Sequence, residues 1–135
     1  MALISNVVGQ GIALDAKTGR ATQTARTTYL ALLTTAPTAT TTLATMAEVT
    51  GTGYSRQSVT WAAPSGTPRS TSNTNVITFG PFSFDPASVG WVALVSAASG
   101  TTGDLIDSWS VDVARDATTG DSITLAASAI SLVQA

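Results

Sequence analysis

Short runs of β-favouring residues, separated by turns, are the feature that most constrains the fold of this chain. Each run is rich in valine, isoleucine, threonine or aromatic residues, and glycine, proline, serine or threonine clusters bound it. Such runs are typical of strands. They cover residues 28–34, 54–61, 75–79, 90–95, 105–113, 122–126 and 129–133. Their fairly even spacing predicts a mainly β fold, an antiparallel β-sandwich or barrel of roughly seven to eight short strands.

Two runs are apolar on both faces, which indicates strands covered from both sides. Residues 28–34 form one of them, and residues 90–95, the most hydrophobic run, are expected at the centre of the sheet. The run 105–113 alternates, but Asp107 falls on the same face as Leu105 and Trp109. We therefore expect a bulge or an edge at Asp107.

The remaining segments give weaker signals. The last two runs, 122–126 and 129–133, lie so close together that either a hairpin or one bulged strand is expected. Residues 62–75 contain two prolines and a polar Ser-Thr-Ser-Asn-Thr-Asn stretch, so an exposed loop is predicted there.

The N-terminal segment, residues 2–16, is the one stretch with helical periodicity, because its apolar residues fall near i, i+4 and i+8. These residues are Leu3, Ile4, Val7, Val8 and Ile12. The segment is interpreted either as an arm that docks on a neighbouring subunit or as a helix or strand folded onto its own core. We predict one domain over residues 1–135, with a helix or arm at 1–16 and a β core at 28–133.

The stretch Gly-Thr-Gly-Tyr-Ser-Arg-Gln holds a basic residue, Arg56, shortly after Glu48, which is the only glutamate. Gly51 and Gly53 allow a tight turn between them. We expect Glu48 and Arg56 to meet across this turn as a structural salt bridge, since partly buried arginines are normally paired. The alternative is an arginine reserved for a ligand or partner.

Charge is scarce in this chain. Charged residues make up 10% of it, against about 25% in an average domain, and the net charge is −2. This composition indicates either a surface covered in an assembly or the serine- and threonine-rich surface of an extracellular β protein. Without a basic stripe, nucleic-acid binding is not expected. No apolar run is long enough for a membrane span, and no signal peptide is recognised, so synthesis in a cytoplasm is expected.

The residue inventory also excludes most catalytic chemistry. There is no histidine or cysteine, which removes the common nucleophilic triads and zinc ligand sets. Aspartates gather in the last third of the chain, at positions 104, 107, 112, 116 and 121. Neither a facing carboxylate pair for glycoside hydrolysis nor a calcium loop pattern is evident among them. We predict a protein that is not an enzyme and uses no metal, cofactor or small-molecule substrate.

The three tryptophans all fall on predicted strands, and core packing is the simplest interpretation for them. Trp61 is nevertheless a candidate contact, because tryptophan is enriched in interface hot spots. With Leu3, Ile4, Val7 and Val8 it completes our set of candidate subunit contacts.

The order of these signals resembles a group of small tailed-bacteriophage virion proteins, described as tail-fibre-like and in some phages as coating the head. The resemblance rests on Tyr-Ser-Arg-Gln at 54–57, Thr-Tyr-Leu-Ala-Leu at 28–32, Gly-Trp-Val at 90–92, Gly-Asp-Leu at 103–105 and Gly-Asp at 120–121. It implies a β-rich structural protein present in many copies.

Two locations in the virion are compatible with this resemblance. The first is a capsid decoration (cement) protein, bound to the major capsid protein on the outer surface of the head and associated with itself, as a trimer. The alternative is a tail-tip or tail-fibre-associated protein that contacts the host surface, with an exposed tryptophan available for binding sugar.

Overall fold

The structure is a computed structural model that describes residues 3–133; the side chains of residues 3–5 and of Asp112 lie outside the description. The described residues form nine strands and one helix, which confirms the predicted mainly β fold with a short N-terminal helix. The elements are β1 (Leu3–Ser5), α1 (Val7–Thr18), β2 (Thr28–Leu33), β3 (Gln57–Val59), β4 (Ser70–Ser72), β5 (Ile77–Phe79), β6 (Val89–Val95), β7 (Leu105–Arg115), β8 (Ile123–Leu125) and β9 (Ser131–Val133).

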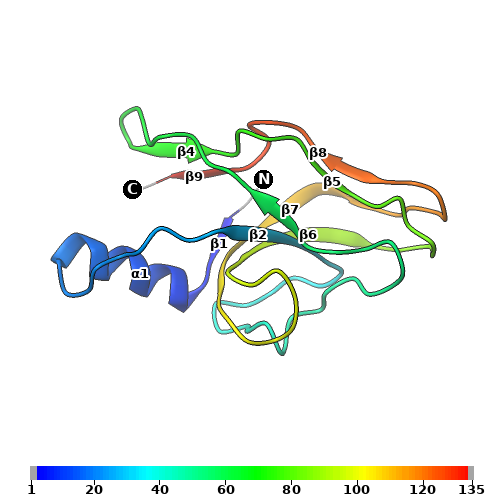
Figure 1. The fold of residues 1–135 in the computed structure, drawn as a ribbon, viewed down its shortest axis with the longest axis horizontal. Coiled ribbons are helices and arrows are strands. Elements are labelled where there is room, and N and C mark those ends of the chain that lie inside the picture. Colours follow the sequence, from blue (N-terminus) through cyan, green and yellow to red (C-terminus); the bar gives the residue numbers. More distant parts are fainter. Residues whose placement is uncertain (1–2, 134–135) are drawn as a thin grey trace.

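The strands lie in two layers. One layer is a five-stranded antiparallel sheet in the order β1-β7-β6-β2-β3, with β6 at its centre as predicted for the most hydrophobic run. The other layer consists of two short antiparallel pairs, β4–β9 and β5–β8. Figure 1 shows these pairs lying along one side of the large sheet, with α1 at one end of the molecule.

Alternating residues of β2 point to two different apolar clusters. Leu30 and Leu32 join the cluster between the two layers, whereas Ala31 and Leu33 join a second cluster on the other face of the sheet. The first cluster also contains Val92, Leu94 and Trp109 from the large sheet and Ile77, Phe79, Leu125 and Ile130 from the second layer. Fully burying each of the larger side chains stabilises the fold by about 1.5–3 kcal/mol.

The bulge expected at Asp107 is present. Leu94 pairs with Asp107 while Val95 pairs with Leu105, so Ile106 is an extra residue on β7. An added residue reverses the face of every side chain that follows it in the strand. The bulge at Ile106 therefore explains why Asp107 does not continue the alternation that starts at Leu105.

The predicted helix over residues 2–16 is wrong at its start; residue 2 lies outside the described range. Leu3–Ser5 is a strand, β1, that pairs with β7 through the register Leu3↔Trp109. The helix begins only at Val7, where the Asn6 side chain accepts the Val8 N–H at 3.0 Å, and it ends at Gly19 in the left-handed region. The helical spacing of the apolar residues was outweighed by this cap and by the edge of β7, which supplies backbone partners.

Two further expectations fail in the second layer. β8 and β9 form neither a hairpin nor one bulged strand, because β8 pairs with β5 and β9 pairs with β4. The segment 62–75, predicted as an exposed loop, contains β4. None of the three residues of β4 is fully buried, so its Ser-Thr-Ser sequence carries no apolar alternation. The pattern that predicts a strand is therefore missing there.

Candidate functional site

Glu48 and Arg56 lie together at the end of β2, on the large sheet. Arg56 Nε donates to Glu48 Oε1 at 2.8 Å and Arg56 Nη2 donates to Glu48 Oε2 at 2.8 Å. The Arg56 side chain is only 4% exposed and that of Glu48 is 19% exposed. Two parallel charge-assisted hydrogen bonds of this kind are stronger and more directional than a single contact.

A glycine turn brings the two residues together. Gly53 has a φ of 91°, and a Cβ at this position would collide with the carbonyl oxygen of Pro81. A side chain at residue 53 would therefore be strained in conformation and would also have no space. The turn closes with Tyr54 N–H donating to the Gly51 carbonyl at 3.2 Å, and the chain then returns to Glu48.

Tyr54 is the third member of this cluster. Its hydroxyl donates to Glu48 Oε1 at 2.8 Å and accepts the backbone N–H of Leu32 at 3.0 Å. Burial, followed by the nearby Glu48 carboxylate, raises the pKa of Tyr54 well above its usual range. The pKa of Arg56 is also raised, mainly by its hydrogen bonds to Glu48. The hydroxyl thus stays protonated and the guanidinium stays charged.

Arg56 also fastens the loop between β6 and β7. Its Nη1 donates to the Ala97 carbonyl at 3.0 Å and its Nη2 donates to the Gly100 carbonyl at 2.8 Å. Together with the two bonds to Glu48, these contacts use most of the five N–H donors of the guanidinium. The arrangement is that of a structural clamp with almost no donor left for a ligand.

The structure describes the side chains of only two of the four N-terminal candidate contacts, Val7 and Val8. Those of Leu3 and Ile4 lie outside the description, while Val7 is 51% exposed and Val8 is partly buried. α1 approaches β7 closely at Gly9, where a Cβ would collide with the Ile106 carbonyl, and its Ile12 packs against the core. Val7 therefore points away from the body, and a contact through it stays a prediction.

All three tryptophans pack within the molecule. Trp61 is partly buried, its ring lies 6.3 Å from that of Trp109, and its Nε1 donates to Thr28 Oγ1 at 3.2 Å. Trp109 is buried and donates to the Ser131 carbonyl at 2.9 Å, and Trp91 is partly buried against the second apolar cluster. None of the three is an exposed platform on which a sugar ring could stack.

Two aspartates in the connection between β7 and β8 accept hydrogen bonds from N–H groups of this chain. Asp116 Oδ1 accepts the Ser88 N–H at 2.6 Å, and Asp121 Oδ2 accepts both the N–H and the hydroxyl of Thr118. These bonds to Thr118 lower the pKa of Asp121. Within residues 3–133, no group of three or more acidic side chains is placed to hold a metal ion.

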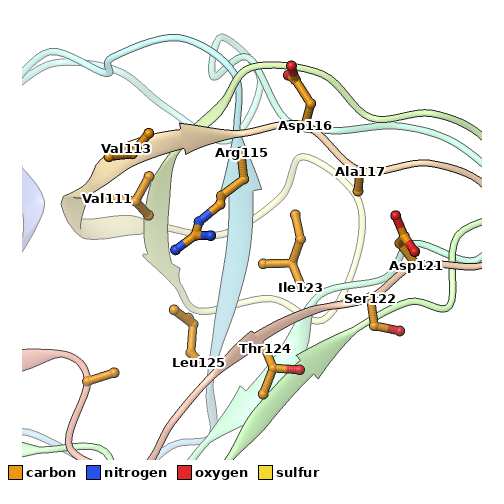
Figure 2. Close-up of a pocket in the computed structure, with 11 residues that line it drawn as sticks. Val111, Val113, Arg115, Asp116, Ala117, Asp121, Ser122, Ile123, Thr124 and Leu125 are labelled. Carbon is orange, nitrogen blue, oxygen red and sulfur yellow. The ribbon is translucent and has the colours of Figure 1, made fainter.

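Sequence reasoning missed a hollow in the surface, which lies between the end of β7 and β8. It has a volume of about 550 Å³ and an apolar wall formed by Val111, Val113, Ile123 and Leu125. Figure 2 shows Val111 and Val113 on one side of it, Ile123 and Leu125 on the other, and Arg115 reaching between them. The alternation in residues 105–113 had indicated that Val111 and Val113 share a face, but not that this face would be uncovered.

A family model described as podophage GP4 fiber I protein gp80 matches residues 4–133, nearly the whole chain. The chain belongs to this Gp80 family. The match confirms the resemblance to phage virion structural proteins and places the chain among components of the virion. No curated protein matches the chain.

Membership of the Gp80 family bears on the two locations inferred above. The family description names a fibre, so it favours the alternative interpretation, a tail-fibre-associated protein, over capsid decoration. The one helix in the described part of this Gp80 protein is too short to cross a membrane.

Proposed function

We propose that this protein is a structural component of the fibres on the tail of a podophage and that it does no chemistry of its own. The observation that carries the proposal is the match of a fibre-protein family over residues 4–133. The architecture is compatible with that role, because two strand layers packed on a shared apolar cluster, with the Glu48–Arg56 pair fastening loops of the large sheet, make a stiff body suited to bearing load between neighbours.

The contacts of this body with the rest of the fibre are also a proposal. The outer side of α1 is the first candidate, because Val7 and Leu14 are 51% and 61% exposed and lie two helical turns apart on one face. Trp61 is a weaker candidate than the sequence indicated, since it packs on Trp109. A host-surface role through an exposed tryptophan is not included in the proposal.

Gold-labelled antibody against this protein, applied to intact virions, tests its location. We expect label at the tail end, with an antibody against the major capsid protein marking heads in the same preparation as a control. Label spread over the head would contradict the proposal and would favour the decoration protein.

Virions assembled without the protein give a second test. A fibre component predicts particles that keep their DNA under heat or chelation but adsorb poorly to host cells. Loss of head stability with normal adsorption would contradict it.

A further inference from the structure

The end of β7 extends beyond the layer that should cover it. Three residues on one face of this strand become progressively more exposed along the chain. Trp109 is 1% exposed, Val111 is partly buried and Val113 is 70% exposed. The same face thus begins inside the core and ends uncovered, where a valine gains nothing from contact with water.

The second layer ends at β8, next to this uncovered face. β8 pairs with β5 on one side, and no described strand pairs with its other side. Ile123 and Leu125 point into the hollow while Thr124 meets Thr78 across the pair, so the inward-facing residues of β8 continue the apolar wall. An unpaired strand edge beside an uncovered apolar face is a template for one more strand.

Arg115 reaches into the hollow between its two apolar walls and differs from the other arginines. Arg20, Arg26 and Arg56 each pair with a carboxylate of this chain, and Arg69 donates to the Pro64 carbonyl at 2.8 Å. The Arg115 side chain has no hydrogen-bond or ion-pair partner among residues 3–133, and Figure 2 shows it pointing into the hollow. Asp116 and Asp121 also line the hollow, but their carboxylates already accept the N–H groups of Ser88 and Thr118. A partner seated there is expected to provide a carboxylate for it.

We propose that the hollow between β7 and β8 accepts an extended, acidic segment of another virion protein, which adds as a third strand beside β8. Backbone hydrogen bonds to the β8 edge hold the segment, and its inward side chains cover Val111 and Val113. Because strand side chains alternate, the inward positions are apolar near Val111 and Val113 and acidic near Arg115. The proposal concerns a partner surface and does not depend on whether the protein sits on the tail or the head.

The lining favours a polypeptide over a saccharide. The apolar part of the lining is aliphatic, and no aromatic ring lines the hollow, whereas sugars are commonly held by stacking on aromatic faces. The unpaired backbone of β8 offers alternating donors and acceptors along a line, which match an extended peptide.

Synthetic peptides of defined sequence test the proposal with the full-length chain. The probe is the labelled peptide Ac-STDTVTVTS-amide, together with its reversed sequence to cover both strand directions. Two controls are the version with asparagine in place of aspartate, and Ac-SDTTVTVTS-amide, in which the carboxylate moves to the outward face of the strand. By fluorescence anisotropy we expect the acidic probe to bind about two- to fivefold more tightly than either control, the range of a partly exposed ion pair.

Substitutions in the hollow supply the matching evidence. Arg115→Ala should abolish the preference for the acidic peptide without changing the affinity for the asparagine version. Val113→Lys should abolish binding of every peptide, whereas Val76→Lys, at a valine that is 61% exposed outside the hollow, should leave it unchanged. Binding should also slow amide hydrogen exchange at Ile123–Leu125.

Three results would overturn the proposal. One is failure of the acidic peptides to bind at about 1 mM, the weakest affinity of interest. Another is binding that is insensitive to Val113→Lys, which would place the contact elsewhere. The third is a dimer of the free chain, seen by sedimentation and lost in Val113→Lys, which would make the occupant a second copy of this protein.

Discussion

Asn73 joins the two short sheets through Ile130: its side-chain Oδ1 accepts the Ile130 N–H at 3.1 Å in the interior of the second layer. Its Nδ2 donates to the carbonyls of Asn75 and Ala126, at 2.9 and 3.0 Å. The Asn73 carbonyl in turn accepts the Ser128 N–H at 2.8 Å. One fully buried amide thus connects the β4–β5 segment to the β8–β9 segment where neither backbone can continue its ladder.

Asn73→Ala is expected to lower the free energy of unfolding by about 3–5 kcal/mol, because it leaves several buried backbone groups without partners. Urea unfolding measures the loss. Thr124→Ala is the matched control, since Thr124 is exposed and should change stability by no more than about 0.5 kcal/mol. Equal effects from the two variants would show that the Asn73 amide does not hold the layer together.

Glu48→Gln is expected to lower the free energy of unfolding by about 3–5 kcal/mol, because the guanidinium of Arg56 stays charged and buried with its carboxylate gone. Replacing Arg56 with Met in the same chain should recover part of this loss, since methionine leaves no unpaired buried charge. For comparison, Asp15→Asn breaks the pair with Arg20, whose side chain is 74% exposed, and should cost at most about 1 kcal/mol. A Glu48→Gln loss as small as this one would contradict the role of the clamp.

Tyr54→Phe should remove a pH dependence of stability in the alkaline range. The raised pKa of Tyr54 means that the unfolded chain releases the hydroxyl proton near pH 10 while the folded chain keeps it. The stability of the native protein should therefore fall above about pH 10, by about 1.4 kcal/mol per pH unit from this group. Urea midpoints at two alkaline pH values, compared between native chain and variant, measure the difference. Parallel declines in both chains would rule out Tyr54 as the source.

Gly53→Ala and Gly11→Ala should change stability in opposite directions. A Cβ at position 53 meets the Pro81 carbonyl and a φ of 91°, so destabilisation of at least about 1–3 kcal/mol is expected. Gly11 lies inside α1 with nothing within 4 Å of the added Cβ, so alanine there should stabilise by about 0.5–1 kcal/mol. Thermal unfolding of both variants measures the two effects. Destabilisation by Gly11→Ala would mean that position 11 is not an uncrowded position inside a helix in solution.

Local pattern was enough for the parts of this fold that repeat a simple rule. The apolar runs in 28–34 and around Trp91 predicted the covered strands β2 and β6, because burial on both faces selects apolar residues at every position. The lone glutamate and Arg56, either side of two glycines, predicted an ion pair, and the structure places the two side chains in contact. In contrast, the spacing of Leu3, Ile4 and Val7 predicted that the helix covers this whole segment. The structure has a strand at Leu3–Ser5 instead, because Asn6 caps the helix and sets its start after Ser5.

The sequence by itself determined that this chain is a β protein with little charge and without histidine or cysteine, because turn residues and strand propensities act over a few neighbours. Only the tertiary structure decided that β8 and β9 pair with different strands, and that β7 outruns the layer above it and leaves Val113 and Arg115 uncovered. Both outcomes depend on which distant segments meet. No local pattern records this, since long-range pairing is chosen by the packing of the whole core.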